Sequence, residues 1–201
     1  MQLPTHPTHR ELVLASTSPY RRELLERLRI PFTVHAPAVD ETPQTGEWPA
    51  TLAQRLALAK AEAVALIHPD KVVIGSDQVA DLHGLCLGKP GSHERAVEQL
   101  RQMSGQQVVF QTAVAVVCQQ SRFSQQALAA VRVQFRVLSA RAIENYLRME
   151  QALDCAGSAK SEGLGIALLE RIDSDDPTAL MGLPLIRTAA LLRAAGLDGL
   201  A

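Results

Sequence analysis

The 201-residue chain has few cysteines, few aromatic side chains and almost no net charge. Its three cysteines, Cys86, Cys118 and Cys155, are far apart and form no C-x-x-C pair, which argues against a zinc site or a disulfide framework. With 20 basic and 21 acidic residues, no overall positive field attracts the protein to nucleic acid or to a membrane surface. We therefore expect a protein of a reducing, cytoplasmic compartment that has no nucleic-acid or membrane partner and binds any polyanion locally.

Long apolar runs and a targeting segment are also absent. No run approaches the roughly 18 residues that a membrane-spanning helix needs. Residues 1–10, MQLPTHPTHR, contain two prolines and no apolar stretch, which indicates a flexible tail and excludes a signal peptide. His6 and His9 have no acidic or cysteine partner nearby, which disfavours a metal site there. The remaining length and the 47% apolar content predict one globular domain over residues 11–201.

Apolar runs alternate with helical patterns along this domain. The runs predict strands at residues 11–15, 32–36, 72–76, 108–118, 131–137 and 164–169. Caps, prolines and helical spacing predict helices at residues 20–28, 49–67, 92–103, 139–149 and 184–195. A hairpin at residues 78–87, with its turn at His83-Gly84, breaks a purely parallel order, so we expect an α/β fold with a mixed twisted sheet flanked by helices. The expected buried stripe of the helix at residues 49–67 is Leu52, Leu56, Ala59, Ala63 and Leu66.

The turn after the first predicted strand has the sequence S-T-S-P and carries Ser16, Ser18 and Arg21. Free backbone N–H groups and the helix dipole at such a turn favour an anion, and phosphate is the natural ligand. The alternative is that Ser18 only caps the helix and Arg21 is a solvated surface charge. The local sequence favours neither interpretation.

Further charged residues follow or interrupt the predicted elements: Asp40, Glu41, Lys60, Asp77 and Lys89. A bound triphosphate needs several cationic or N–H partners, and a hard metal ion needs oxygen ligands such as Glu41 and Asp77. Each position has a plainer interpretation as a surface or turn residue. Asp77 is the exception, because a carboxylate directly after the buried run VVIGS is costly unless it binds a ligand, accepts hydrogen bonds or lines a cleft.

Several motifs occur in order along the chain: L-A-S-x-S-P-x-R, V-D-E, RLALAKA, IGSDQV, GKP, CAGSAKSEGLG and GLPL. They span nearly everything after the first ten residues, and together they resemble the Maf family of nucleotide pyrophosphatases. The resemblance implies a mixed α/β fold of two lobes with a deep central cleft, and a homodimer. It also implies a divalent cation, Mg²⁺, Mn²⁺ or Co²⁺, and hydrolysis of a nucleoside triphosphate to the monophosphate and pyrophosphate.

The resemblance also implies a role for each matching residue. Ser16 and Arg21 would hold phosphates, while Lys60 and Lys89 would neutralise charge from other sides of the cleft. Glu41 and Asp77 would hold the metal ion. Asp77 would also be the general base that deprotonates the attacking water.

Three further positions correspond to selectivity determinants of the family, and here they are Tyr20, Gln78 and Glu162. The branch that acts on dTTP and UTP typically has Arg, Thr and Gln there, so the chain is more similar to the branch active on 7-methyl-GTP, in which Trp is common at the first position. The positively charged 7-methylguanine can stack on Tyr20 with a contribution of roughly 0.5 to 2 kcal/mol. Glu162 can accept from N1–H and the N2 amino group of the base, and Gln78 can read another polar edge.

Three alternatives to this substrate assignment remain open at the level of the sequence. The same chemistry can act on a pyrimidine triphosphate such as dTTP or UTP, or on a damaged purine triphosphate. The chain can also be a nucleotide-binding regulator of cell division with little catalysis.

Overall fold

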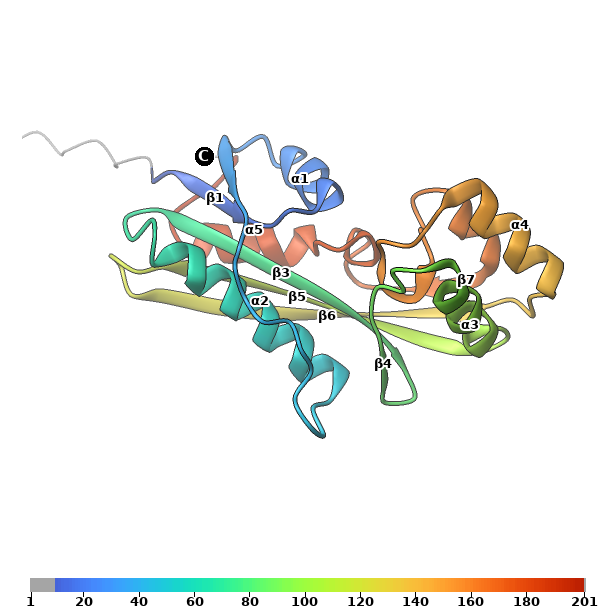
Figure 1. Cartoon of the computed structure of the whole chain (residues 1–201). Helices are drawn as coiled ribbons and strands as arrows, with labels where there is room; N and C mark the ends of the chain where they lie inside the picture. The colour runs from blue at the N-terminus through green and yellow to red at the C-terminus, as the bar shows by residue number, and fades with distance from the viewer. Residues whose placement is uncertain (1–9, 201) are drawn as a thin grey trace, which may run out of the picture.

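The computed structural model describes residues 10–200. The tail predicted for residues 1–10 therefore falls, apart from its last residue, outside the described part. Within residues 10–200 the chain forms one sheet of seven strands, in the order β2-β1-β3-β5-β6-β7 with β4 paired to β3 (Figure 1). The strands are β1 (Leu12–Ala15), β2 (Phe32–His35), β3 (Val72–Leu82), β4 (Leu85–Leu87), β5 (Gln107–Cys118), β6 (Phe123–Phe135) and β7 (Leu169–Asp173).

Five α-helices and three short 3-10 helices complete the described part of the chain. Ser18, Ser92 and Ser139 cap α1, α3 and α4 as predicted, each accepting a hydrogen bond from the backbone three residues on. None of the helices in residues 10–200 is long and apolar enough to cross a membrane. The helices are α1 (Pro19–Glu26), α2 (Pro49–Ala65), α3 (His93–Met103), α4 (Ala140–Glu150), α5 (Leu185–Ala194), η1 (Ala156–Ser158), η2 (Leu164–Leu168) and η3 (Ala179–Met181).

The sheet is mixed, as the sequence predicts. β1 runs parallel to β2 and β3, because helices α1 and α2 return the chain to the same end, whereas the other pairs are antiparallel. The turn between β3 and β4 has positive φ at both His83 (53°) and Gly84 (90°), a backbone that matches the twist of a two-residue hairpin. The α/β fold class and the hairpin are confirmed, and the division into two lobes stays a prediction.

Helices cover both faces of one half of the sheet. Leu12, Leu14 and Ile74 pack in the cluster with α1 and α5, while Val13 and Val73, which alternate with them, pack against α2 on the opposite face. Helices α3 and α4 lie together at the other end of the sheet, at the right in Figure 1, around a separate apolar cluster. The sheet thus connects two apolar regions. One lies on both faces of the half covered by α1, α2 and α5, and the other lies at the α3–α4 end.

Helix α2 lies unusually close to β3 at Gly75. A Cβ atom at this position would overlap the backbone oxygen of Ala57 and would lie 2.6 Å from the amide nitrogen of Ala61. Only glycine allows this approach, and small residues on the helix match it. The contact sets the position of the α2 side chains relative to β3.

The predicted buried stripe of α2 is right at its start and wrong at its end. Leu52 and Leu56 are buried, but Ala59 and Ala63 are only partly buried and Leu66 is 73% exposed. The buried face of the helix differs from the predicted stripe because small residues must face Gly75 at the close contact. The buried residues of its second half are Ala57, Lys60, Ala61, Val64 and Ala65.

The strand predicted at residues 164–169 is also wrong, because these residues form η2 and the last strand, β7, begins only at Leu169. The Glu150 carboxylate accepts a hydrogen bond of 2.6 Å from the amide of Leu164, which removes that amide from any strand ladder. Gly165 lies so close to the backbone of Lys160 that a side chain would not fit. The other predicted elements are confirmed to within a few residues, with two exceptions: β6 begins eight residues earlier, at Phe123, and β3 continues six residues past Ser76, to Leu82.

Candidate active site

A cavity of about 500 Å³ lies beside β3 where that strand continues beyond its neighbour. β1 ends at Ala15, opposite Gly75, and β4 begins to pair with β3 only at Ala80. Residues 76–79 of β3 therefore have no partner strand on this edge among the described residues, while β5 pairs with the other edge throughout. The prediction that the strand ends at Asp77 is wrong, because β5 continues the ladder and places Asp77 in the middle of an 11-residue strand.

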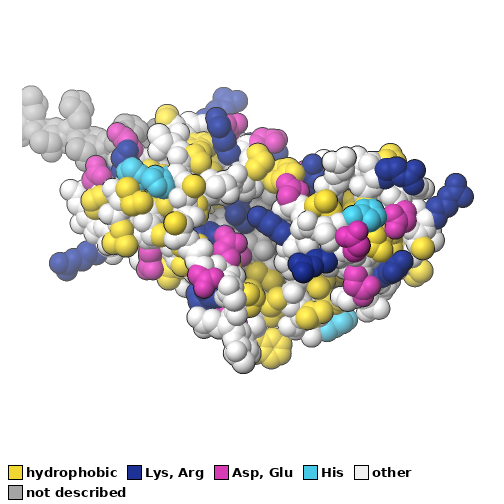
Figure 2. All heavy atoms as spheres, in the orientation of Figure 1, with side chains coloured by type: hydrophobic (Ala, Val, Ile, Leu, Met, Phe, Trp, Pro, Cys, Tyr) yellow, Lys and Arg dark blue, Asp and Glu magenta, His cyan; other side chains and the backbone are white. Residues whose placement is uncertain are grey.

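The cavity brings together every site residue that the sequence predicts. Figure 2 shows basic and acidic side chains gathered around a hollow near the centre of the drawn face. These residues come from the β1–α1 turn, the first turn of α1, the loop before α2, α2 itself, β3, the turn after β4 and the segment after α4. The predicted residues that line the cavity are Ser16, Tyr20, Arg21, Glu41, Lys60, Asp77, Gln78, Lys89 and Glu162.

Lys60 joins the two carboxylates predicted to hold a metal ion. Its Nζ lies 2.7 Å from Asp77 Oδ1 and 2.7 Å from Glu41 Oε1. Lys60 and Asp77 are buried and Glu41 is exposed at the rim. A buried lysine and a buried aspartate are tolerated because each compensates the charge of the other. Lys60 is therefore a cavity residue, and its plainer interpretation as a surface charge is wrong.

The electrostatics of Glu41 show that three cations surround it. Desolvation alone would raise the pKa of Glu41, but Lys60, helped by the charges of Lys89 and Arg21, outweighs it and lowers that pKa below its ordinary value. Glu41 therefore remains ionised and holds its place among the cations.

Arg21 is partly buried at the start of α1. Its Nε donates a 2.9 Å hydrogen bond to the carbonyl oxygen of Gly182, to which Ser76 Oγ also donates at 3.0 Å. Burial lowers the pKa of Arg21, against the opposing effect of the Asp77 and Glu41 charges. Among residues 10–200 no protein acceptor binds the terminal nitrogens of Arg21, so they are free to bind a phosphate. Arg21 is not a solvated surface charge.

The serines of the β1–α1 turn are ordered by local hydrogen bonds. Ser18 Oγ accepts from the amide of Arg21 at 3.4 Å, and Ser16 Oγ accepts from the amide of Ser18 at 3.1 Å. Ser18 is thus the helix cap that the plainer interpretation proposes, and Ser16 is buried on the cavity wall. The turn presents the N-terminal end of α1 to the cavity, where an anion is favoured.

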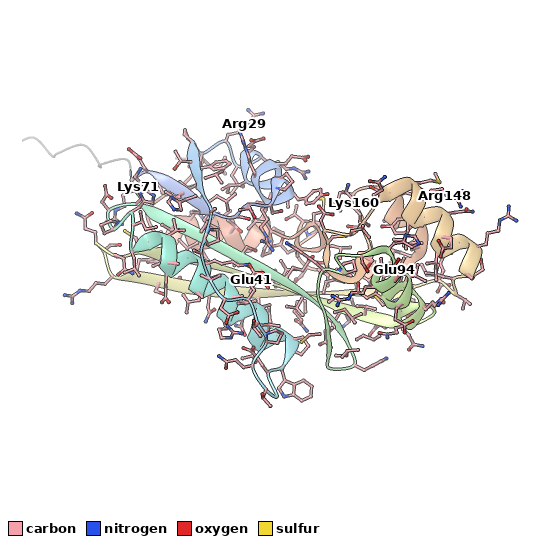
Figure 3. The ribbon with its side chains drawn as sticks, in the orientation of Figure 1. Arg29, Glu41, Lys71, Glu94, Arg148 and Lys160 are labelled. Carbon is pink, nitrogen blue, oxygen red and sulfur yellow. The ribbon has the colours of Figure 1, made fainter. Side chains whose placement is uncertain are left out.

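The three predicted selectivity residues have different surroundings. The ring of Tyr20 lies 5.3 Å from Nζ of Lys160, which is itself paired with Glu150 at 3.2 Å. Figure 3 shows Lys160 between α1 and α4 and Glu41 beside α2. Glu162 is exposed at the rim, whereas Gln78 lines the cavity and its amide nitrogen donates hydrogen bonds to the Thr112 hydroxyl and to the carbonyl oxygens of Ala179 and Leu180.

The structure adds cavity residues that sequence reasoning missed, among them Asp154, Cys86 and Cys155. Burial raises the pKa of Cys155 to about 12 and raises that of Cys86 as well, so both remain thiols and neither is a ready nucleophile. Sequence reasoning also missed Thr112, whose hydroxyl oxygen accepts a hydrogen bond from the side-chain amide of Gln78. The available signal was the polar pair Gln111-Thr112 inside the mostly apolar run of β5.

The charged side chains of the cavity nearly cancel, with a formal sum of -1. A triphosphate would therefore enter a site with no excess positive charge of its own. Among residues 10–200 no group of three or more His, Cys, Asp or Glu side chains could hold a metal ion, and Glu41 and Asp77 form a pair of carboxylates. The charged residues are the cations Arg21, Lys60 and Lys89 and the carboxylates Glu41, Asp77, Asp154 and Glu162.

Comparison with known proteins gives one family and a set of similar sequences. The model of a family described as "Maf-like protein" matches residues 11–195. A protein of Polaromonas sp. (strain JS666 / ATCC BAA-500) is 73% identical over 190 residues, which cover 94% of this chain and 87% of that protein. One from Albidiferax ferrireducens is 64% identical, covering 96% of this chain and 97% of its own length, and one from Bordetella pertussis is 56% identical, covering 94% of each. All three are named 7-methyl-GTP pyrophosphatase.

Proposed function

Because the chain belongs to the Maf-like protein family, we propose that it hydrolyses 7-methyl-GTP to 7-methyl-GMP and pyrophosphate, and so removes a modified nucleotide. The names of its relatives, one of which is 73% identical over a stretch that covers 94% of the chain, support this substrate. The observation that carries the chemistry is the pairing of Lys60 with both Asp77 and Glu41 in a cavity that Arg21 and Lys89 also line. Such a site combines cations for phosphates with carboxylates for a base and a metal ion.

In this proposal Asp77 is the general base. Lys60 binds its Oδ1, which leaves Oδ2 to accept a proton from water. The activated water attacks the α-phosphorus and forms a new P–O bond, the bond from this phosphorus to the bridging oxygen breaks, and pyrophosphate leaves. Lys60, Lys89 and the terminal nitrogens of Arg21 bind the phosphates and stabilise the charge that develops on the leaving group. Ser16 orders the turn that presents the N-terminus of α1 to the same phosphates.

A divalent cation fits this set of residues. Mg²⁺ is usually held by one or two carboxylates together with substrate phosphates, and Glu41 and Asp77 are two carboxylates that line the same cavity and both pair with Lys60. The charged side chains of the cavity sum to -1, so an added cation would also offset the triphosphate. When bound, such an ion would neutralise phosphate charge and lower the pKa of a water molecule. We propose Mg²⁺, Mn²⁺ or Co²⁺ as the cofactor, held by Glu41 and Asp77.

The base is read at the other side of the cavity in this proposal. The segment after α4 contributes the carboxylates Asp154 and Glu162, which suit the positive charge of 7-methylguanine. Tyr20 provides an aromatic face for stacking, and Glu162 accepts hydrogen bonds from the donor edge of guanine. A pyrimidine such as uracil offers neither the positive charge nor the same donor edge.

The test is a panel of nucleotides with pyrophosphate release as the readout. The panel contains 7-methyl-GTP, GTP, UTP and dTTP, each with Mg²⁺, Mn²⁺ and Co²⁺ and with a chelator. We expect 7-methyl-GTP to have the highest kcat/KM and the chelator to abolish turnover. Better cleavage of UTP and dTTP would overturn the roles of Tyr20 and Glu162, and binding without turnover of any nucleotide would favour a regulator.

The homodimer that the family resemblance implies and the cytoplasmic location that the cysteine content indicates are also kept as proposals. Size-exclusion chromatography with light scattering tests the first, and cell fractionation tests the second.

A further inference from the structure

One stretch of β3 lies between two strands that both leave it. β1 ends opposite Gly75, where the chain turns into α1. On the other side of the gap, β4 pairs with β3 only up to Leu87. The carbonyl oxygen of the next residue, Gly88, accepts a 3.0 Å hydrogen bond from Gln99, which ties the chain to α3. The gap is therefore built into the fold, and it leaves the edge of β3 free around Gln78.

Strand geometry fixes which backbone groups this free edge presents. The amide of Val72 donates to the carbonyl oxygen of Glu11, beside β1, and every second residue of a strand directs its N–H and C=O to the same side. The hairpin gives the same result from the other end, because Leu82 and Leu85 flank its two-residue turn and face each other. Steps of two from either place reach Gln78, whose backbone N–H and C=O thus point into the gap.

These two backbone groups of Gln78 have no partner within residues 10–200. The register gives β3 no neighbouring strand at Gln78 on this side, and neither the loops nor the side chains bond to its backbone. Val79 differs, because its backbone groups point the other way, to Gln111 of β5. An unpaired N–H beside an unpaired C=O on a strand edge is a template for a ligand that offers the complementary pair.

The cavity lies against this edge. Asp77 and Gln78 are consecutive, so their side chains leave opposite faces of the sheet. Asp77 meets Lys60 of α2 on one face, and Gln78 meets the Ala179 carbonyl of η3 on the other, yet both residues line the same cavity. Because β5 covers the far edge of β3, a space lined from both faces meets the strand at its free edge.

The free edge suits a nucleobase better than a phosphate. A phosphate carries acceptor oxygens, so it would meet the C=O of Gln78 unfavourably, and the cations of the cavity already serve the phosphates in the proposed function. Guanine has O6, an acceptor, directly beside N1–H, a donor, and the two point the same way. This lactam edge matches an N–H that lies beside a C=O.

We propose that the free backbone of Gln78 binds the lactam edge of the base, with its N–H donating to O6 and its C=O accepting from N1–H. The inference rests on the proposed function and deepens it. The N2 amino group, next along the same edge of guanine, is left for the carboxylate of Glu162. Uracil also has a lactam, so the strand recognises the base edge, and Tyr20 and Glu162 select the methylated purine.

The first experiment follows the backbone amides of the unmodified full chain by NMR, as their exchange with water on the time scale of seconds. In the free protein the amide of Gln78 should exchange readily, and that of Val79, which faces β5, should not. Saturation with the α,β-methylene analogue of 7-methyl-GTP and Mg²⁺ should slow exchange at Gln78 by about 10-fold or more. Protection of Gln78 already in the free protein, or exchange that persists in the complex, would overturn the inference.

Two control ligands separate the base from the phosphates. Inorganic tripolyphosphate has no base. The α,β-methylene triphosphate of 7-methyl-2-aminopurine riboside keeps the positive charge and the N2 amino group but lacks O6 and N1–H. At saturation, both should leave exchange at Gln78 within about 2-fold of its rate in the free protein. Protection by tripolyphosphate would assign the edge to phosphate, and protection by the aminopurine would assign it to the ribose or to exclusion of water; either result contradicts the inference.

Turnover provides a second readout with hydrolysable nucleotides. We expect kcat/KM for the triphosphate of 7-methyl-2-aminopurine riboside to be about 100-fold below that for 7-methyl-GTP, because both backbone groups of Gln78 lose their partners. A difference of less than about 3-fold would show that the lactam edge is not bound. If the 7-methyl-GTP analogue changed no amide signal of the protein at all, the result would instead count against the proposed function.

Discussion

At the scale of single residues, the site depends on a lysine between two carboxylates. Lys60 holds Asp77 and Glu41 at 2.7 Å each, so it fixes both carboxylates before any ligand binds. Asp77 is 7% exposed, and one of its oxygens remains available to the cavity. A base that is fixed in advance needs little reorganisation when the reaction occurs.

Asp77→Asn is expected to lower kcat for 7-methyl-GTP by about 10² to 10⁴-fold, the usual contribution of a general base. The nucleotide Kd should change little, because Asn keeps the shape and Glu41 still holds Lys60. Pyrophosphate release and calorimetric titration measure the two quantities.

The matched control is Asp81→Asn, the same chemical change on the same strand outside the cavity lining. It should keep turnover close to that of the unmodified protein. Full turnover in Asp77→Asn would remove Asp77 from the mechanism.

At the scale of elements, the distance between α2 and β3 decides whether Lys60 reaches Asp77. Gly75 lies against the backbone of α2, and Lys60 follows Ala57 by less than one helical turn. β1 ends at this level, opposite Gly75, which opens the edge of β3 next to Asp77. Helix, strand end and glycine together form the wall that bears the reactive groups.

Gly75→Ala is expected to push α2 away from β3, because the new Cβ meets backbone atoms that cannot rotate away. The free energy of unfolding should fall by roughly 2 to 3 kcal/mol, as for other overpacked cores. Turnover should fall as well, since Lys60 and Asp77 move apart. Urea denaturation and pyrophosphate release measure these effects.

Gly88→Ala provides the stability control, because a Cβ there meets no atom within 4 Å. It should leave the urea midpoint nearly unchanged. A stable and fully active Gly75→Ala variant would show that α2 does not depend on this contact.

At the scale of the whole molecule, the cavity draws its residues from both ends of the sheet. Ser16, Arg21 and Lys60 come from elements packed at one end, and Lys89 and Glu162 come from segments near the α3–α4 end (Figure 1). A ligand that contacts both sets would connect the two apolar regions of the protein. Binding should therefore stabilise the entire chain against unfolding.

A non-hydrolysable α,β-methylene analogue of 7-methyl-GTP is expected to raise Tm. At about 100 times its Kd, the ligand contributes about 2.7 kcal/mol. For a chain of this size each kcal/mol raises Tm by about 2 to 4 °C, so the shift should be about 5 to 10 °C. Differential scanning calorimetry with the divalent cation present measures it. The same concentration of the UTP analogue should give a smaller shift, and an equal or larger one would contradict the proposed base selection.

The sequence by itself determined the features that depend on neighbouring residues. Ser18 with Pro19 begins α1, Ser92 and Ser139 begin α3 and α4, and His83-Gly84 turns the hairpin, because caps and tight turns are decided within a few residues. The order of motifs also identified the cavity residues, since all nine of those predicted line one cavity. Their chemical roles remain proposals.

Only the tertiary structure decided how distant segments meet. That β3 continues through Asp77 depends on its pairing with β5, and the buried face of α2 depends on the contact at Gly75. The hydrogen bonds of the Gln78 amide go to Thr112, 34 residues away, and to Ala179, 101 residues away. Hydrogen bonds and close contacts between such remote residues leave no periodic pattern in the sequence, because each forms only when the whole sheet and its helices have assembled.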